Sequence, residues 1–199
     1  RRMGTRGRLG GRSQTTADAV KAVDAFGRDI ICVETVGVGQ SEVDIVKAAD
    51  TTMVVLIPGM GDDIQAIKAG ILEIGDVFAI NKADHDGADK LVTEINMLLD
   101  LDGVMKEWRP PIQKVIANQN IGVTEIISLI EKHHEHIKAN GQLTQKRTER
   151  TRNEMLDILN SGIGSYITRN IVDNGKLDEL VKDIKAHKTD PYTVVGNIM

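Results

Sequence analysis

A short polar motif follows one of the most apolar segments of the sequence. Asn81, Lys82 and Asp84 form an Asn-Lys-x-Asp motif directly after the apolar run 77–80. A carboxylate at position 84 can accept hydrogen bonds from both N1–H and the exocyclic amine of guanine, whereas adenine offers no such pair. The Lys82 stem can lie over the base, and the Asn81 amide can tie neighbouring loops together. The motif predicts a guanine-binding loop; the alternative is a polar turn that only ends a strand.

A second motif, Glu34-Thr35-Val36-Gly37, follows another apolar run at 30–33. It is similar to the Asp-x-x-Gly element of nucleotide hydrolases, with Glu in place of Asp. In that element the acid holds a Mg²⁺ ion through water, and the glycine N–H points at the terminal phosphate. We therefore expect Glu34 at a metal site and Gly37 at a phosphate. The alternative is a simple glycine turn after a strand.

Two further observations concern the same nucleotide chemistry. Ile116-Ala117 ends the last expected strand, where guanine-binding proteins carry a Ser-Ala pair whose alanine N–H meets the base, although Ile116 departs from that pattern. No Gly-x-x-x-x-Gly-Lys-Ser/Thr phosphate loop occurs, and Gly175-Lys176 is the only Gly-Lys pair. In proteins with this order of motifs the phosphate loop lies upstream of the acidic element. We therefore expect an N-terminal portion of the nucleotide-binding domain to be absent from the sequence.

The elements that must position these motifs alternate along the chain. We expect strands at 30–33, 53–57, 77–80 and 112–117, and helices at 15–26, 41–49, 63–72, 88–99 and 123–137. Short continuous apolar runs of this kind are typical of strands covered on both faces. The alternation predicts an α/β fold with a doubly wound, mainly parallel sheet of the P-loop NTPase type, lacking its phosphate loop. Ligands of such sheets bind at the carboxyl ends of the strands, where the motifs lie.

After Gly141 the pattern changes to charged helical stretches, and we expect two regions. Residues 1–141 form the C-terminal portion of a nucleotide-binding domain, and residues 142–199 form an all-helical extension.

Composition excludes several classes of protein. The chain has 199 residues, a net charge of −4, 41% hydrophobic residues and only 3% aromatic residues. The scarcity of aromatic side chains argues against a stacking surface for nucleic acid. The sequence contains no run of about 18 apolar residues, so it predicts no membrane-spanning helix. A single cysteine, Cys32, fits a reducing, cytoplasmic setting, and its apolar neighbours predict a small buried side chain.

Other candidate sites have plainer explanations. His133, His134 and His136 gather near a helix end, but no cysteine accompanies them, and a solvated helix face is the favoured interpretation over a metal site. The region 138–152 carries the basic residues Lys146, Arg147, Arg150 and Arg152 against Glu149. A dimer arm or a solvated helix is the favoured interpretation over nucleic-acid binding, because aromatic residues are scarce and the chain is acidic overall.

The motifs together resemble one family, the methylmalonyl-CoA mutase-associated GTPases of the MeaB/ArgK type, over residues 1 to about 143. The resemblance is carried by the strings 5–11, 33–44, 58–71 and 81–84 and by Trp108-x-Pro110-Pro111. Members of that family carry Glu, as at position 34 here, where other nucleotide hydrolases carry Asp. The resemblance implies a GTPase that binds GTP or GDP with Mg²⁺ and assists cofactor loading and protection of an adenosylcobalamin-dependent acyl-CoA mutase. It also implies a homodimer joined largely through the helical extension.

The resemblance also implies roles for single residues. Gly37 contacts the γ-phosphate, Glu34 lies in the magnesium shell, and Asn81, Lys82 and Asp84 read guanine with Ala117 beside them. Gln40 and Lys68 are the catalytic candidates, one in a switch loop at 40–44 and one in a second loop at 59–68 that faces the mutase. For Gln40 a turn residue that caps the next helix is an equal alternative.

Two other functions stay open. The chain can belong to a GTPase that delivers metal to another metalloenzyme, or it can act as a non-enzymatic interaction module. The missing phosphate loop motivates the second alternative, and we expect residues 1–199 alone to hydrolyse little or no GTP.

Overall fold

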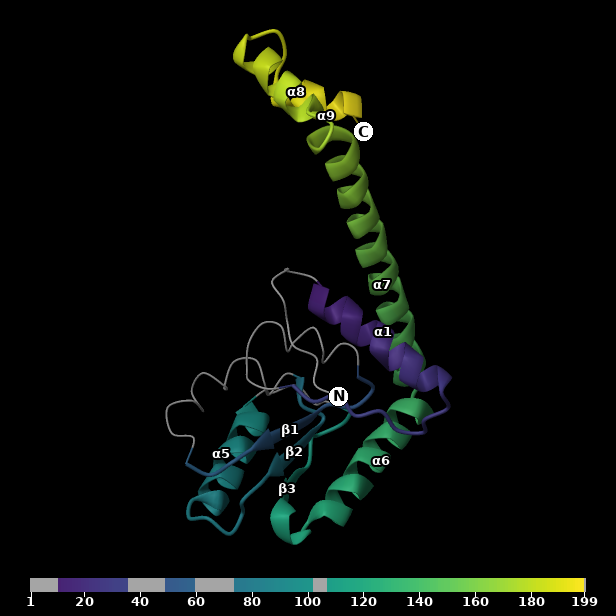
Figure 1. Ribbon diagram of the computed structural model, residues 1–199. Coiled ribbons are helices and arrows are strands. Elements are labelled where there is room, and N and C mark those ends of the chain that lie inside the picture. Colours follow the sequence, from purple (N-terminus) through teal and green to yellow (C-terminus); the bar gives the residue numbers. More distant parts are fainter. Residues whose placement is uncertain (1–10, 36–48, 60–73, 102–106, 199) are drawn as a thin grey trace. The chain divides into compact units, whose positions relative to one another are not determined.

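The computed structural model describes residues 11–35, 49–59, 74–101 and 107–198 (Figure 1). The chain forms two compact units, 1–150 and 151–199. The first unit holds α1 (Gly11–Ala25), β1 (Met53–Leu56), β2 (Val77–Ile80), α5 (Ala88–Leu101), β3 (Ile112–Lys114), the 3₁₀ turn η1 (Ala117–Gln119) and α6 (Val123–Ala139). Helix α7 (Gln142–Ile167) begins in the first unit and continues into the second, which adds the π-helical turn η2 (Thr168–Val172), α8 (Lys176–Lys185) and α9 (Pro191–Ile198).

The described strands form a parallel sheet in the order β1-β2-β3. In its register Val54 pairs with Phe78, and Phe78 pairs with Ile112. All four residues of β2 are buried, so the central strand is covered on both faces. Such burial follows from the sequence Val-Phe-Ala-Ile, which carries no polar side chain on either side of the strand.

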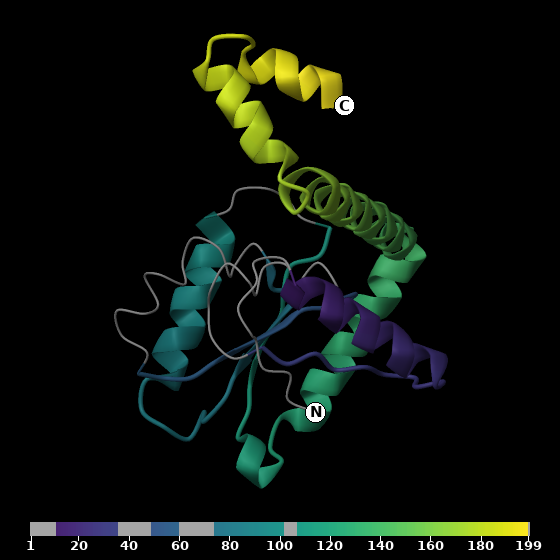
Figure 2. The same ribbon diagram turned by 45° about the horizontal axis from the view of Figure 1, so that its top comes forward.

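Helices cover both faces of the sheet, as Figure 2 shows for α5 and α6. Phe78 and Ile80 point to one face and pack with Leu91 and Ile95 of α5. Val77 and Ala79 point to the other face and pack with Val115 and with Ile126 of α6. Each large apolar side chain buried in this way contributes about 1.5–3 kcal/mol. The structure therefore confirms the predicted doubly wound α/β arrangement.

Several predicted elements are confirmed, with shifted ends. The helix expected at 15–26 is α1, which begins at Gly11, and the helix expected at 88–99 is α5, which runs to Leu101. The strand expected at 112–117 ends at Lys114, because the chain turns into η1 at Ala117. The helices expected at 41–49 and 63–72 lie outside the described residues, apart from Ala49. The described residues after Gly141 form helices and no strand, as predicted.

The buried strand expected at 30–33 is wrong. Residues 30–33 carry no strand assignment, Ile30 is 79% exposed, and Cys32 is exposed rather than buried. No backbone hydrogen bond joins this segment to another of the described residues. An apolar run favours a strand only when neighbouring strands satisfy its N–H and C=O groups.

Two apolar positions are also more exposed than predicted. Val55 of β1 is 52% exposed, although its strand was expected to be covered on both faces, and Ile127 of the expected helix 123–137, now α6, is 50% exposed despite its apolar side chain. In β1 only Leu56 is fully buried, so this strand is covered mainly on its α5 face.

The lengths and compositions of the described helices can be compared with what a membrane-spanning helix needs. Within the described ranges, no helix combines the length and the apolar composition that crossing a bilayer requires.

Candidate functional site

The Asn-Lys-x-Asp motif begins where β2 ends and joins two loops at the carboxyl ends of the strands. The N–H of Asn81 donates to the carbonyl oxygen of Leu56 on β1, at 2.8 Å. The Asn81 Oδ1 atom accepts hydrogen bonds from the N–H of Lys82 at 2.8 Å and from the N–H of Ala117 at 3.2 Å. One amide oxygen therefore connects the loop after β2 to the loop after β3.

A second backbone contact strengthens this connection. The N–H of Ala83 donates to the carbonyl oxygen of Val115 at 3.1 Å, and the N–H of His85 closes a turn onto Lys82. Lys82 has a φ of +56°, a left-handed conformation that costs a non-glycine residue about 1 kcal/mol. Residues held in such conformations cluster at binding sites, because the surrounding contacts must compensate for the strain.

The loop that carries Ala117 is itself held in a defined shape. Ile116 and Ile121 form an isolated antiparallel bridge on either side of η1. Gly122 has a φ of +78°, and a Cβ atom there would lie 2.3 Å from the carbonyl oxygen of Lys114. Glycine is therefore required where this loop passes close to β3.

The Asp84 carboxylate lies open to solution beside these contacts. Its side chain is 45% exposed, and the His85 Nε2 atom lies 3.9 Å from Asp84 Oδ2. An exposed carboxylate held in a loop of fixed shape can accept a pair of N–H donors from a ligand.

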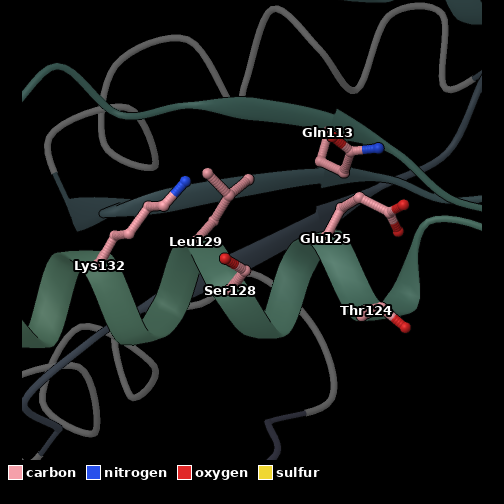
Figure 3. A pocket seen from close by; sticks show the side chains of 6 residues that line it. All are labelled: Gln113, Thr124, Glu125, Ser128, Leu129 and Lys132. Atoms are coloured by element: carbon pink, nitrogen blue, oxygen red, sulfur yellow. The ribbon is translucent and has the colours of Figure 1, made fainter.

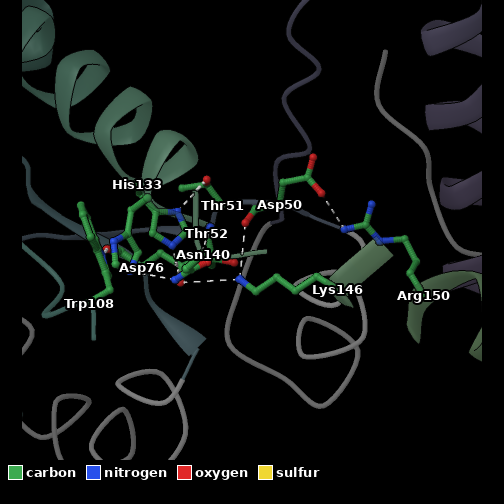
Figure 4. A network of polar contacts seen from close by, with 10 residues as sticks. Asp50, Thr51, Thr52, Asp76, Trp108, His133, Asn140, Lys146 and Arg150 are labelled. Atoms are coloured by element: carbon green, nitrogen blue, oxygen red, sulfur yellow. Dashed lines mark hydrogen bonds and ion pairs between the residues drawn. The ribbon is translucent and has the colours of Figure 1, made fainter. Parts of the chain in front are cut away.

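A different polar cluster lies at the amino ends of the strands, where Thr52 precedes β1 and Asp76 precedes β2 (Figure 4). His133 of α6 is only 2% exposed. Its Nδ1 lies 2.8 Å from Thr51 Oγ1, and its Nε2 lies 3.3 Å from Asp76 Oδ1. The histidine cluster was predicted to be solvated, which is wrong for His133, because that residue lies on the inner stripe of α6 with Ile126 and Ile137.

Asp76 is the centre of this cluster. Its carboxylate accepts the N–H of Thr52 at 2.8 Å, and its carbonyl oxygen accepts the Nε1–H of Trp108 at 2.8 Å. Partial burial alone raises the pKa of Asp76, but the hydrogen bonds from His133 and Thr52 and the charges of His133 and Lys146 outweigh burial and lower it. The cluster fastens α6 and the start of α7 to the sheet and lies away from the Asn-Lys-x-Asp motif.

Asp50 likewise joins the segment before β1 to α7, through ion pairs whose contribution to stability should depend on pH. Its carboxylate lies 2.7 Å from Arg147 and 3.0 Å from Arg150. Burial alone raises the pKa of Asp50, but hydrogen bonds and charge from the two arginines outweigh it and hold the pKa below its ordinary value of 3.8. The pairs therefore stabilise the fold above pH 3.8, and this contribution is lost as the pH falls through the lower folded-state pKa.

We expect Asp50→Asn to lower the free energy of unfolding by about 1 kcal/mol at pH 7, because the pairs are partly exposed. The difference from wild type should shrink toward zero in strong acid. Urea unfolding at neutral and acidic pH measures it. Asp157→Asn, at an exposed α7 carboxylate, serves as the control. A difference for Asp50→Asn that stays constant with pH would contradict the assignment.

Comparisons with known proteins show the family to which the chain belongs. A sequence model described as "Methylmalonyl Co-A mutase-associated GTPase MeaB" matches residues 1–171. The chain belongs to this MeaB family. A Pyrococcus abyssi protein provisionally named a GTPase is 44% identical over the whole chain, which covers 62% of that protein. The GTPase ArgK of Escherichia coli is 34% identical over 73% of the chain and 45% of its own length.

Two further relatives extend the comparison. The mouse protein named methylmalonic aciduria type A homolog, mitochondrial, is 37% identical over 72% of the chain, which covers 35% of the mouse protein. A solved structure titled as an LAO/AO transport system kinase matches 94% of the chain and 61% of its own chain, with a TM-score of 0.67 and 25% identity. The relatives that match the whole chain are longer than it is, and the chain spans about three fifths of their length. The MeaB family and this structural likeness confirm the predicted P-loop type of α/β fold.

In this MeaB-family chain the predicted site residues divide into three groups. Asn81 and Ala117 are brought together, and Lys82 and Asp84 are exposed in the same loop. Glu34 is exposed and forms no hydrogen bond or ion pair with another described residue. The candidates Gly37, Gln40 and Lys68 lie outside the described residues. The sequence did not indicate the contacts of Ala83 and Gly122, because backbone hydrogen bonds leave no mark in residue type.

Replacing Asn81 by Ala tests the connection between the loops. The change removes the acceptor for two N–H groups, and we expect a loss of about 1–2 kcal/mol in the free energy of unfolding. Amide hydrogen exchange should speed up at Lys82 and Ala117. Asn118→Ala is the matched control, because Asn118 is exposed beside Ala117 and its side chain forms no hydrogen bond within the described ranges. Equal exchange rates in the two variants would show that the Asn81 amide does not hold the loops.

Proposed function

We propose that the protein binds guanine nucleotides at the carboxyl ends of β2 and β3 and hydrolyses GTP. The observation that carries this proposal is the bridge from Asn81 to Ala117 beside the exposed Asp84 carboxylate. Adenine cannot offer the N1–H and amino donors that such a carboxylate requires, so the loop selects guanine. Membership of the MeaB family, whose description includes GTPase, supports the same activity.

The proposed roles follow from this geometry. Asp84 accepts the two guanine donors, the stem of Lys82 lies over the base, and Asn81 holds the two loops in register. The Ala117 N–H donates to Asn81 in the described conformation, so a guanine oxygen would have to share or replace that bond. Gly37, Gln40 and Lys68 are proposed for phosphate binding and for positioning of the attacking water.

Magnesium is the proposed metal, because GTP hydrolysis requires charge to be neutralised on the phosphates. The ion would supply that neutralisation when bound. Glu34 fits such an ion, since its exposed carboxylate is an oxygen ligand that no described side chain engages.

The proposed biological role is that of a cytoplasmic chaperone for an adenosylcobalamin-dependent acyl-CoA mutase. It would use GTP hydrolysis to control cofactor loading and to protect the mutase. The family description and the mouse relative's name support this client. Purified mutase of the methylmalonyl-CoA type should bind the protein and raise its rate of GTP hydrolysis. If the mutase neither binds nor changes the rate, the proposed chaperone role is contradicted.

We also propose that residues 142–199, the extension that follows the nucleotide-binding region at 1–141, form a homodimer arm. Within the second unit, α7 exposes Leu156, Leu159 and Ile163, at 51%, 55% and 51%, with the spacing of a helix–helix seam. Leu159→Glu should convert a dimer into a monomer in analytical ultracentrifugation. Asn160→Glu, next to it on the exposed helix, is the control.

Nucleotide titration tests the central proposal. Isothermal titration of the protein, as its gene encodes it, should show GDP binding at least about 100-fold tighter than ADP. Equal affinity for the two nucleotides would contradict the assignment of the guanine loop.

A further inference from the structure

A groove runs between the edge strand β3 and helix α6 (Figure 3). Its volume is about 360 Å³, and its walls come from one residue of β3 and from two turns of α6. The lining residues are Gln113, Thr124, Glu125, Ser128, Leu129 and Lys132. Only Leu129 among them is apolar, so the groove offers a small apolar floor between polar walls.

The outer edge of β3 is open at Ile112, whereas the Gly122 backbone lies against the Lys114 carbonyl oxygen. β3 is the last strand of the described sheet, and none of the described strands pairs with its outer edge. The carbonyl oxygen of Pro111 and the N–H of Val115 bond to β2. Because bonding directions alternate along a strand, the backbone groups of Ile112 and Lys114 point away from β2. The Lys114 carbonyl accepts the Gln113 side chain, which leaves the two N–H groups and the Ile112 carbonyl for another strand.

Opposite charges lie at the two ends of the groove. Glu125 and Lys132 are both exposed, and neither forms an ion pair with another residue of the described ranges. They are seven positions apart along the α-helix, which is a rise of about 10 Å. Glu125 lies in the first turn of α6, near the carboxyl end of β3, and Lys132 lies toward its amino end. Leu129 falls between the two charges.

We propose that this groove binds an extended peptide segment that adds to the outer edge of β3 as a further strand. Alternate side chains of the peptide enter the groove: a basic one toward Glu125, an apolar one over Leu129 and an acidic one toward Lys132. Every second residue of a strand advances by about 6.8 Å, so charges four residues apart lie about 14 Å apart, with an apolar residue between them. The long side chains of Glu125 and Lys132 can reach the few ångströms by which this exceeds their own separation along the helix. Backbone hydrogen bonds provide affinity and the two charges provide selectivity.

The selectivity can be tested with labelled seven-residue peptides in fluorescence anisotropy. The mixed-charge peptides carry Glu, Val and Lys at alternate positions, in either order, with Thr between them. Doubly basic and doubly acidic peptides are the comparison set. Wild type should bind a mixed-charge peptide about threefold or more tightly than either like-charge peptide. Lys132→Glu should shift the preference to the doubly basic peptide, and Glu125→Lys to the doubly acidic one.

Two controls separate strand addition from general charge attraction. Glu131→Lys changes an exposed α6 charge outside the groove and should leave the preference unchanged. N-methylation of the peptide amides that face β3 should weaken binding about tenfold, because it removes backbone donors without changing side chains. Thermal unfolding of each variant confirms that these exposed substitutions leave the fold intact.

Some results would overturn the proposal. Affinities that ignore the charge pattern, or that survive N-methylation, would exclude a strand-like ligand. Self-association of the protein that Glu125→Lys and Lys132→Glu each abolish would assign the groove to a second copy of the chain instead. None of these outcomes bears on nucleotide binding, which is measured separately with GDP.

Discussion

Asp84→Asn should change the base that the protein prefers from guanine to xanthine. The wild-type carboxylate offers two acceptor oxygens, which match the N1–H and amino donors of guanine. An asparagine amide replaces one acceptor with a donor, and xanthine carries a carbonyl oxygen where guanine has its amino group. We expect GDP affinity to fall by about 100-fold and the affinity for xanthosine diphosphate to rise above it. Competition binding with the two diphosphates measures both changes.

The neighbouring carboxylate provides a matched control. Asp86 is exposed two residues further along and its side chain engages no other described residue, so Asp86→Asn should leave the GDP affinity close to that of wild type. The midpoint of thermal unfolding should also be unchanged in both variants, since the Asp84 side chain is 45% exposed. If Asp84→Asn still prefers GDP over xanthosine diphosphate, Asp84 does not bind the base, even if other residues of the loop do.

The sequence predicts the middle of this fold well because local pattern and burial agree there. The run Val77–Ile80 is apolar on both sides and forms the central strand, where any polar side chain would be buried. In α5, Leu91 and Ile95 recur at the helical spacing and are both buried. In each case the residues that determine the local conformation are also those that form the core.

The edges of the sheet were predicted less well, since a strand at an edge depends on partners that the local sequence does not specify. The runs 30–33 and 53–57 look as apolar as 77–80, yet 30–33 forms no strand and Val55 of β1 is half exposed. Hydrophobicity indicates that a segment can be buried, but hydrogen-bonded neighbours decide whether it becomes a strand and how many of its faces are covered.

The candidate site shows the same division. Asn81 was predicted to tie neighbouring loops and lies within hydrogen-bonding distance of the loop after β3, because consecutive parallel strands bring their carboxyl ends to one edge. The contacts of Ala83 and Gly122 could not be predicted, since they depend on loop conformations that residue types alone do not determine.

The buried histidine was missed although a signal for it exists. Ile126, Ile130, His133 and Ile137 follow each other at intervals of four, three and four residues, the spacing of a single helix face. The three neighbouring histidines and their charged flanks instead give the sequence of this part of α6 a polar pattern, which favours a solvated face. A histidine on an apolar stripe is compatible with burial only when both ring nitrogens find partners, and Thr51 and Asp76 provide them.

His133→Ala should therefore cost the fold more stability than its size implies. The change leaves a cavity next to Trp108, whose ring centroid lies 5.0 Å from that of His133, and it removes the ring nitrogens that engage Thr51 and Asp76. Cavity formation and the lost polar contacts together should lower the free energy of unfolding by about 3–4 kcal/mol. Urea unfolding at pH 7 measures the loss.

His134 and a double-mutant cycle make this prediction specific. His134 is next in sequence but only partly buried, and its ring forms no hydrogen bond or ion pair within the described ranges, so His134→Ala should cost less than about 1 kcal/mol. If the ring nitrogen and the carboxylate interact directly, the losses from His133→Ala and Asp76→Asn should not add. A coupling energy of about 1 kcal/mol or more would establish the pair. Additive losses would mean that His133 does not interact directly with Asp76 and stabilises the fold through its contacts with Thr51 and Trp108.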